Sequence, residues 1–321
     1  MYQKSLISIL ILFVFSVEVF SQEDFFQQEF AIANENDVYV FKNTDRYYSN
    51  GILLHFRFLP NAETWLGKRK HLDRKRIIDV ELSQKFYTPV DLTLRNFEDF
   101  DRPYAGYLYA GLTVADFPRA NQRLEYGLEL GVVGRASGAE AFQTWYHANV
   151  GFPTPRGWGF QIPNEITLNL KAQYDYQWSL LPGKIDLVSS SRAVVGSAFT
   201  HFVQRADIRF GRLQVLNQSG FANALIGERK GDFRNHFYFF VGYGQQWTIH
   251  DITIQGSLWN DDAPHTEDII SSVRHARVGW AASSANTTFR MTYHWLSEEV
   301  EGARNHDYVG LELLLRFKTR E

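Results

Sequence analysis

The stretch ITLNLKAQYDYQW, from Ile166 to Trp178, alternates apolar and polar side chains along its whole length. Successive side chains of a β-strand point to opposite faces, so this alternation gives an extended chain one apolar face and one polar face. The apolar face carries Ile166, Leu168, Leu170, Ala172, Tyr174, Tyr176 and Trp178. A helix would repeat near every 3.6 residues, and a strand buried on both sides would be apolar throughout. The pattern therefore predicts a strand with one wet face.

The same period of two recurs along the chain, for example at Arg123 to Val132, Ile78 to Phe86 and Phe289 to Trp295. We count about twelve segments of about 9 to 12 residues, the length that a tilted strand needs to cross a bilayer. They begin near Phe30, Tyr48, Arg76, Tyr107, Arg123, Ile166, Ile185, Val203, His236, Ile269, Thr287 and Tyr308. The pattern predicts an all-β fold, an antiparallel transmembrane β-barrel. A soluble β-sandwich is the alternative, but it would carry fewer rings at its strand ends.

The composition is typical of a barrel in an outer membrane. The chain has 16% aromatic residues and 23 Gly, and membrane barrels carry girdles of aromatic side chains. The predicted last strand ends in Phe317, close to the C-terminus. No long continuous apolar run is present, which argues against transmembrane helices. The net charge of -3 argues against a nucleic-acid partner.

Residues 1–21 run from a short basic start at Lys4, through the apolar segment Leu6 to Phe15, to a small residue at Ser21. This order predicts a secretory signal peptide that is cut before Gln22. A membrane anchor is the alternative, but the apolar run is short and Glu18 interrupts its end. We therefore expect residues 22–321 to form one barrel domain in the cell outer membrane.

The connections between the predicted strands are unequal. Leu181 to Lys184 and Ser284 to Asn286 predict tight turns, whereas Tyr87 to Pro103 and Arg135 to Asn164 are long and rich in polar and aromatic residues. An even number of strands places both termini on the periplasmic side and these long loops outside. The polar faces then line a lumen filled mostly by side chains. A site for a lipid substrate belongs at a rim, near the wall.

The stretch Asn34 to Gly51 concentrates oxygen-bearing side chains where the first strand ends and the second begins. The candidates are Asn36, Asp37, Thr44, Asp45, Ser49 and Asn50. Their carboxylates, carboxamides and hydroxyls are the hard ligands that calcium prefers. The same residue types also dominate ordinary hairpin turns. By itself the stretch is either a loop or half of a catalytic site.

Within the longest loop, Ser137 to Glu140 has the S-x-x-E form of a capping box ahead of AFQTWYHAN, which predicts a short helix. A spacing of four residues places Gln143 and His147 on one face of that helix. Its aromatic residues can pack against the barrel or lipid; they are Phe142, Trp145 and Tyr146. A lone loop histidine beside Trp and Tyr is more often a packing or surface residue than a catalyst.

Several segments together resemble the calcium-dependent lipid A 3'-O-deacylases of Gram-negative outer membranes. In chain order they are NDVYVF with TDRYYSNG, QKFYTP, DRPYAGYLYAG, the GVVG strand leading into FQTWYH, and RGWGFQIPNE. The match runs from about Asn36 to Glu165 and continues more weakly to the final strand. Members are similar twelve-stranded barrels, with the active site between the wall and a helix of an extracellular loop. The resemblance implies lipid A as substrate, Ca²⁺ as cofactor and an ester hydrolase that works as a monomer.

The resemblance also assigns residues. The family's Asn-Asp pair falls on Asn36 and Asp37, and its hydroxyl residue, usually Thr, falls on Ser49. Its helical Gln and essential His fall on Gln143 and His147. We assign catalysis to His147, Ser49 and Asn36, and the metal to Asp37, Asn36 and Gln143.

Substrate binding is the last role assigned by the resemblance. A basic residue that some members use in the second outer loop has no matching position, and the neighbouring Arg95 is the candidate replacement. We expect Arg95, Trp145 and Tyr146 to bind substrate.

These residues support hydrolysis by water that His147 activates, with the cation polarising the ester carbonyl. No covalent intermediate is needed. One alternative is an outer-membrane phospholipase in which a serine is the nucleophile. Another is a non-enzymatic barrel such as a porin or adhesin, which would explain the alternation but not the oxygen ligands or the Gln143 and His147 helix.

Overall fold

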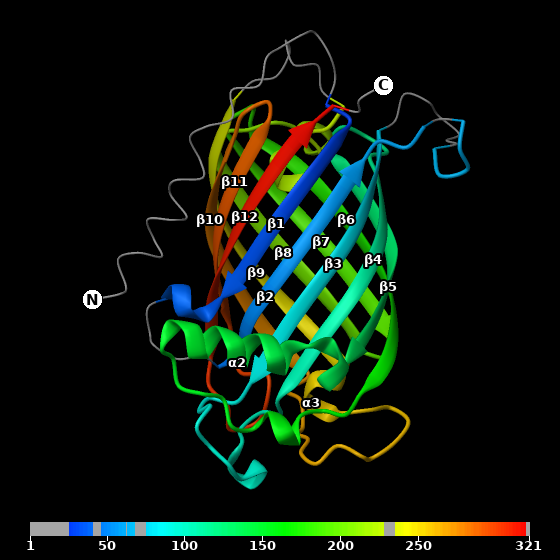
Figure 1. Ribbon diagram of the computed structural model, residues 1–321. Helices are drawn as coiled ribbons and strands as arrows, with labels where there is room; N and C mark the ends of the chain where they lie inside the picture. The colour runs from blue at the N-terminus through cyan, green and yellow to red at the C-terminus, as the bar shows by residue number, and fades with distance from the viewer. Residues whose placement is uncertain (1–25, 41–45, 62, 68–74, 228–234, 319–321) are drawn as a thin grey trace.

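A computed structural model describes residues 26–40, 46–61, 63–67, 75–227 and 235–318. The predicted signal peptide, and Thr44 and Asp45 of the Asn34 to Gly51 stretch, lie outside the described residues. The described chain forms a closed barrel of twelve antiparallel strands, in which each strand pairs with its neighbours in sequence and β1 closes on β12. Figure 1 shows the tilted strands of this barrel.

The strands occupy the following ranges: β1 Gln28–Asn36, β2 Tyr47–Phe58, β3 Arg76–Thr88, β4 Ala105–Asp116, β5 Gln122–Val133, β6 Glu165–Leu181, β7 Ile185–Gly196, β8 Phe199–Arg212, β9 His236–Asp251, β10 Ser272–Ser283, β11 Thr287–Leu296 and β12 His306–Phe317. The predicted strand count and order are confirmed. The largest difference at a strand start is at β8, which begins at Phe199 rather than Val203. β6 and β9 have 17 and 16 residues, more than predicted. A tilted strand needs only about 9 to 11 residues to cross a bilayer, so these two extend beyond it.

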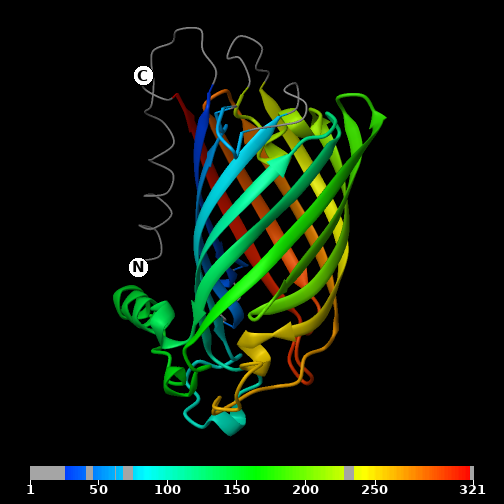
Figure 2. The ribbon, with the colours of Figure 1, turned by 90° about the vertical axis from the view of Figure 1, so that its right-hand side faces the viewer.

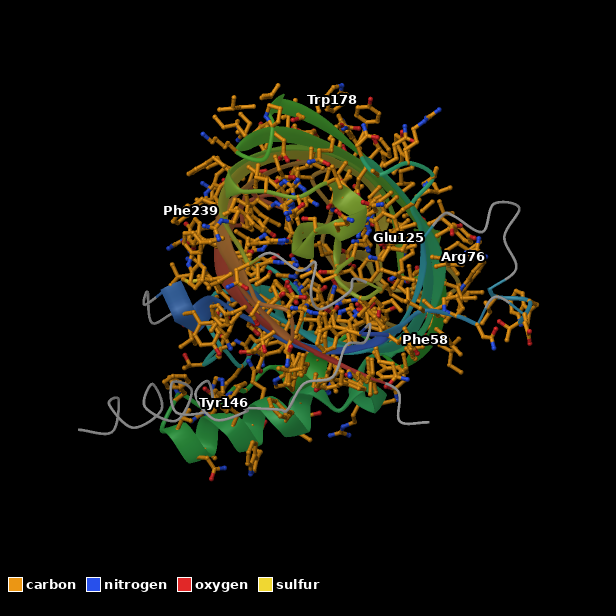
Figure 3. The ribbon with its side chains drawn as sticks, turned by 90° about the horizontal axis from the view of Figure 1, so that it is seen from above. Phe58, Arg76, Glu125, Tyr146, Trp178 and Phe239 are labelled. Carbon is orange, nitrogen blue, oxygen red and sulfur yellow. The ribbon has the colours of Figure 1, made fainter. Side chains whose placement is uncertain are left out.

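The alternation of side chains defines the two sides of the wall. On β5, Leu124, Leu128 and Leu130 are 39%, 42% and 55% exposed on the outside. The intervening Glu125 and Glu129 line the interior cavity. Figure 3 shows the same arrangement from one end, with Glu125 inside the ring of strands and Trp178 and Phe239 outside it. The predicted lipid-facing and lumen-facing sides are thus confirmed.

Many charged side chains inside the barrel are paired. Arg209 and Asp186 lie 2.7 Å apart and are almost fully buried. Arg316 and Glu29 lie 2.8 Å apart and tie β12 to β1 where the barrel closes. Paired charges replace the water that each ion loses on burial, so the polar face is tolerated without a wide aqueous pore.

The two tight turns are confirmed. Lys184 N–H donates to the Leu181 carbonyl over 2.9 Å, and Gly183 has the positive φ of 69° that such a turn requires. Ser284 N–H donates to the Thr287 carbonyl over 2.8 Å in the other turn. The start of β1 and the end of β12 lie at the same end of the barrel, opposite to the helices α2 and α3 (Figure 1). This is the arrangement expected from an even strand count.

The described part of the connection from β8 to β9 folds back into the end of the barrel where β1 begins and β12 ends. It contains the short 3-10 helices η5 Leu216–Gln218 and η6 Gly220–Ala222. Leu216 and Ala222 pack against Ile77 and Val188 of the wall. The Arg209 guanidinium donates to Ser219 Oγ over 3.0 Å. The sequence analysis did not predict this inward fold.

Connections also cross the opposite end. The short helix α3 Ile252–Gln255 follows β9. Arg102, from the β3–β4 connection, is 1% exposed and donates to Thr253 Oγ1 and to Glu299, each over 2.9 Å. Its guanidinium also lies 4.8 Å from the centre of the Tyr87 ring. One arginine therefore joins three connections over the barrel mouth.

The predicted helix in the longest loop is present as α2 Ala139–Val150, but the capping box is wrong. Ser137 belongs to a separate 3-10 turn, η3 Arg135–Ser137, and its hydroxyl donates to the Gly134 carbonyl over 2.6 Å. Gly138, with φ of 75°, occupies the N-cap position without a side chain to cap it. A positive φ is open to glycine and costly for serine, so the helix starts after the glycine. Glu140 accepts instead from Gln161 and Arg135.

Two substitutions to arginine test which side of the wall faces lipid. Leu170 is 59% exposed on the outside of β6, whereas Leu53 of β2 lines the interior cavity. We expect Leu170→Arg to destabilise the barrel by about 2 to 4 kcal/mol near the bilayer midplane, and Leu53→Arg by much less. Denaturant unfolding in lipid vesicles measures both. Equal losses at the two positions would contradict the assignment of faces.

Candidate active site

The outer ends of β1 and β2 carry carboxamides on the lipid-facing side of the wall. Asn34 and Asn36 alternate with Glu35, which lines the lumen, so both asparagines belong to the outer face. Asn36 is paired with Asn50 of β2. Earlier in β1 the same face carries the apolar residues Phe30 and Ile32. Polar groups facing lipid are costly unless they are hydrogen-bonded, so this change of character marks a covered part of the wall.

These carboxamides form a connected network. Asn34 Nδ2 donates to Asn50 Oδ1 over 2.8 Å and to the Gly51 carbonyl over 3.0 Å. Tyr39 lies on the 3-10 helix η1 Asp37–Val40, and its hydroxyl donates to Asn34 Oδ1 over 2.6 Å. The network ties the turn after β1 to both strands, and so fixes where that turn places its own side chains.

Asn36 and Asp37 stand at the start of that turn. Asn36 Oδ1 accepts from Val38 N–H over 2.8 Å, which closes the first turn of η1. Asp37 is 4% exposed, and its Oδ2 accepts from Arg46 N–H over 2.7 Å. Local side-chain to backbone bonds of this kind are the turn chemistry expected of Asn and Asp. They also hold a carboxylate and a carboxamide in one place.

Ser49 sits in an irregularity of β2. The pairing between β2 and β3 shifts between Tyr48 and Asn50, so Ser49 is the extra residue of a bulge. Bulges re-aim side chains next to functional sites. Ser49 is 1% exposed, and its hydroxyl donates a long bond of 3.5 Å to the Phe86 carbonyl. The register thus brings Ser49, Asn36 and Asp37 to one corner of the wall.

Gln143 and His147 lie on the buried face of α2. They are 5% and 2% exposed, while Trp145 between them is 61% exposed. His147 Nδ1 and the Pro153 carbonyl lie 2.6 Å apart. A carbonyl can only accept, so Nδ1 carries the proton in the neutral ring and Nε2 carries the lone pair. The Phe152 ring packs edge-on against the imidazole, with centroids 5.6 Å apart.

Gln143 is oriented by an indole. Trp158, in the 3-10 helix η4 Trp158–Phe160, is 3% exposed, and its Nε1–H donates to Gln143 Oε1 over 2.8 Å. A buried indole N–H normally finds a partner, and here that partner is a predicted site residue. This bond fixes the direction in which the Gln143 carboxamide points.

An apolar cluster holds α2 against the outside of the wall. Phe142 packs on Phe86 of β3, with ring centroids 5.6 Å apart. Gln84 Nε2 donates to the Ser137 carbonyl over 2.6 Å beside it. Tyr104 and Trp158 belong to the same buried cluster. Figures 1 and 2 show α2 outside the barrel, beside the ends of its strands rather than over the lumen.

The second half of α2 lies near η1. Figure 3 labels Tyr146 on the part of α2 that is nearest to η1, and Figure 1 places the two elements together at the same end of the barrel. Burial raises the pKa of the Tyr39 phenol, and the electrostatic effect of Tyr146 adds to the increase. The structure therefore brings the helix with Gln143 and His147 next to the turn with Asn36 and Asp37.

The predicted substrate-binding residues differ in position. Trp145 is exposed on the outer side of α2 and Tyr146 is half-buried. Arg95 is exposed in the β3–β4 connection, just before the 3-10 helix η2 Phe97–Asp99. Phe97 packs on Phe160 with ring centroids 5.3 Å apart, so this connection touches the one that carries α2. A role of Arg95, Trp145 and Tyr146 in binding stays a prediction.

The sequence analysis missed four residues of this site: Asn34, Tyr39, Pro153 and Trp158. Asn34 carries a usable signal, because it interrupts the apolar outer face of β1 after Phe30 and Ile32. Tyr39 and Trp158 carry no such signal, since aromatic residues are common throughout the chain. Pro153 acts through its backbone carbonyl, which no residue type reveals.

Within the described residues, no three His, Cys, Asp or Glu side chains are grouped to hold a metal ion. Across the same part of the chain, no helix has the length and apolar character that crossing a membrane requires.

A protein-family model described as "Outer membrane protein LpxR" matches residues 6–317. The chain belongs to the LpxR family. Among solved structures, LpxR from Salmonella typhimurium superposes with a TM-score of 0.73 at 19% identity, over 90% of this chain and 100% of that chain. The β domain of the Bordetella autotransporter BrkA gives a TM-score of 0.47 at 11% identity, covering 92% of this chain and 100% of that one. The search of curated protein sequences gives no match.

Family membership confirms the resemblance found in the sequence. The protein is an outer-membrane lipid A 3'-O-deacylase of the LpxR family, and hence a carboxylic ester hydrolase. The similarity to the Salmonella structure, at 19% identity, supports the barrel fold.

Trp158→Phe tests whether the indole N–H positions Gln143. The ring and its packing remain, but the bond to Gln143 Oε1 is lost. A net hydrogen bond contributes about 0.5 to 1.5 kcal/mol, so we expect kcat/KM for lipid A deacylation to fall about 2- to 10-fold. Trp65→Phe, at an 80% exposed residue of the β2–β3 connection, is the control. Equal activity in the two variants would remove this role.

Proposed function

We propose that the buried face of α2, together with the neighbouring turn after β1, forms the site that hydrolyses the 3'-linked acyl or acyloxyacyl ester of lipid A. The observation that carries the proposal is that face, which holds Gln143 and an oriented His147 on a helix that lies next to the turn of Asn36 and Asp37. A lipid reaches this site by moving sideways in the outer leaflet. It would not need to enter the lumen.

His147 is the proposed general base. Its Nδ1–H bond to the Pro153 carbonyl fixes the neutral tautomer in which Nε2 is the basic nitrogen, and we assign to Nε2 the proton taken from water. The water oxygen then bonds to the acyl carbon, and the bond between the acyl carbon and the sugar 3'-oxygen breaks. The proton on His147 passes to the departing sugar 3'-oxygen. The products are a free carboxylic acid and lipid A with a 3'-hydroxyl, and no covalent intermediate forms on the protein.

The oxygen donors at the β1–β2 turn fit the calcium ion that the family resemblance implies. Asp37 offers a buried carboxylate, Asn36 a carboxamide oxygen and Ser49 a buried hydroxyl. Hard oxygen donors of mixed type are what Ca²⁺ prefers. We propose Asp37 and Asn36 as its side-chain ligands, with Gln143 as a further donor. When bound there, Ca²⁺ supplies positive charge that polarises the ester carbonyl.

The remaining residues orient the reactants. Asn36 is held by η1, and Ser49 by its bond to the Phe86 carbonyl, so both can direct the water without large rearrangement. Arg95 would meet a phosphate of the substrate, and Trp145 and Tyr146 its acyl chains. Because the closed barrel leaves no free strand edge, we propose that the protein acts as a monomer.

Removal of the metal tests the proposed ligands. Chelation of divalent cations should abolish deacylation, and Ca²⁺ should restore it. Asp37→Asn should weaken Ca²⁺ binding measured by calorimetry, because a carboxylate is replaced by a neutral amide of the same shape. The barrel should still migrate as a folded, heat-modifiable species. Full activity in excess chelator would remove the metal from the mechanism.

His147→Gln and Ser49→Ala together separate the possible mechanisms. If His147 is the base, His147→Gln should lower kcat by at least about 10²- to 10⁴-fold. Ser49→Ala should cost less, since the water and the base remain. Mass spectrometry of released fatty acid, in detergent and on folded protein, measures both. Equal loss in the two variants would indicate a serine nucleophile, and normal turnover of His147→Gln would leave the histidine with a structural role only.

A further inference from the structure

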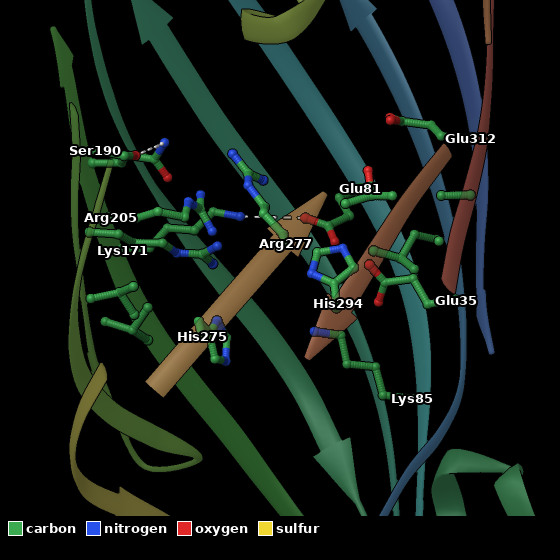
Figure 4. A pocket seen from close by; sticks show the side chains of 18 of the residues that line it. Glu35, Glu81, Lys85, Lys171, Ser190, Arg205, His275, Arg277, His294 and Glu312 are labelled. Atoms are coloured by element: carbon green, nitrogen blue, oxygen red, sulfur yellow. Dashed lines mark hydrogen bonds and ion pairs between the residues drawn. The ribbon is translucent and has the colours of Figure 1, made fainter. Parts of the chain in front are cut away.

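The lumen holds a cavity of about 540 Å³ that the proposed reaction does not use. It extends from the inward-folded β8–β9 connection, where Phe221 lines it, to the opposite end of the barrel, where Glu299 lines it. Figure 4 shows Arg205 and His275 on one side of this cavity, and Glu35 and Glu312 on the other. The sequence predicts a lumen filled mostly by side chains. The structure differs in leaving a cavity that is large enough to hold a small molecule.

The carboxylates near the basic side already have partners. Asp207 binds Arg277 through two hydrogen bonds of 2.7 and 2.9 Å. Asp175 accepts from Arg123 over 2.6 Å, and Glu129 lies 3.0 Å from Lys171. These carboxylates are therefore hydrogen-bonded or ion-paired to Arg277, Arg123 and Lys171, and only Asp207 also lies within 3.4 Å of Arg205.

Four basic side chains converge on this side from β7, β8 and β10: Arg192, His201, Arg205 and His275. The pairing register explains why they meet. Arg205 of β8 is opposite Gly244 of β9, and Gly244 is opposite His275 of β10. Because Gly244 has no side chain, nothing stands between Arg205 and His275 on the inner face. Arg192 lies on β7 and exerts electrostatic repulsion on both Arg205 and His201.

Donor atoms of this group lack acceptors. Arg205 Nε and His275 Nε2 are buried, and neither has a hydrogen-bond partner within the described residues. Arg205 Nε lies 3.4 Å from Asp207 Oδ2, outside hydrogen-bond geometry, and Asp207 is already shared with Arg277. In the part of the chain that the structure describes, Arg192 has no carboxylate partner, and its side chain is exposed to the cavity. Unpartnered buried donors and repelling cations both favour an anion between them.

We propose that this group is a binding site for an anion of the phosphate class inside the barrel. Two guanidinium groups supply paired donors that match a tetrahedral oxyanion, and two imidazoles complete the ring of donors. A single carboxylate would leave most of these donors unused. The anion would relieve the repulsion between Arg192 and Arg205, and it would join β7, β8 and β10 across the lumen. This anion site is separate from the proposed site for lipid A hydrolysis, which lies on the outer face of the wall.

Calorimetric titration of inorganic phosphate into the folded mature barrel, in a zwitterionic detergent at constant ionic strength, tests the site. We expect saturable binding of one phosphate per barrel. Arg192→Gln and Arg205→Gln should each weaken binding about tenfold or more, as the loss of a charge-assisted hydrogen bond implies. Arg192→Gln removes no ion pair of the described residues, so it should fold like the wild type.

Arg212→Gln is the matched control, since Arg212 is an exposed residue at the far end of the same strand as Arg205. It should bind phosphate like the wild type. Thermal unfolding, followed by heat-modifiable migration, should show phosphate raising the midpoint of the wild type and of Arg212→Gln only. Absence of saturable binding, equal binding in all variants, or acetate binding as tightly as phosphate would overturn the proposal. Because no lipid A is present, the result is independent of the deacylation mechanism.

Discussion

A protein surface in contact with lipid cannot leave hydrogen-bonding groups unsatisfied, and this constraint shapes both the barrel and its site. For the backbone the solution is closure, with β1 paired to β12 from Gln28 opposite Phe317 to Asn36 opposite Val309. For side chains the solution is alternation, which sends charges into the lumen. An active site on the lipid side breaks that alternation, and so it needs a cover. Turn η1 provides part of that cover, since the Tyr39 hydroxyl donates to Asn34 Oδ1 and Val38 N–H donates to Asn36 Oδ1.

Placing the site outside the wall suits a membrane-bound substrate. The ester of a lipid in the outer leaflet lies beside the wall, and the exposed Trp145 stands on the outer side of α2. The residues proposed to react are buried on the inner side of the same helix. A short helix can therefore contact lipid with one face and hold His147 in fixed orientation with the other. The backbone carbonyl of Pro153 orients His147, and the indole of Trp158 orients Gln143; both come from the chain that follows the helix.

The strands were predictable because each obeys a period of two that is set by the contrast between lipid and lumen. That contrast acts on every residue of β5 and β6, so their faces can be assigned from sequence alone. The helix was predictable in place but not in its start. Ser137 and Glu140 have the spacing of a capping box, yet Gly138 adopts a positive φ and separates the serine from the helix. A local motif gives the residue types, and the backbone conformation of the intervening glycine decides whether they meet.

The site itself was predictable only through resemblance to a family. Barrel closure and loop packing place the helix that carries His147 beside the turn that carries Asp37, and no local pattern encodes that. Ser49 depends on a bulge that shifts the register by one residue, and Tyr39 depends on the turn around it. Asn34 could have been found in the same way as Asn50, because a carboxamide at a lipid-facing position violates the rule that the rest of the strand follows.

The division between the two faces of the wall also separates the roles of charge in this protein. In the lumen, pairs such as Arg316 with Glu29 and Arg209 with Asp186 are nearly fully buried and join neighbouring strands. Such pairs contribute little net stability, because desolvation offsets their attraction, but breaking one leaves an unpaired buried ion. Because a shift of one strand would break such a pair, the pairs help to fix the register of the strands. The positions of Asn36 and Ser49 depend on that register. The group around Arg205 differs from them, since its cations outnumber their carboxylates and face a cavity, which is the arrangement of a binding site rather than of a structural pair.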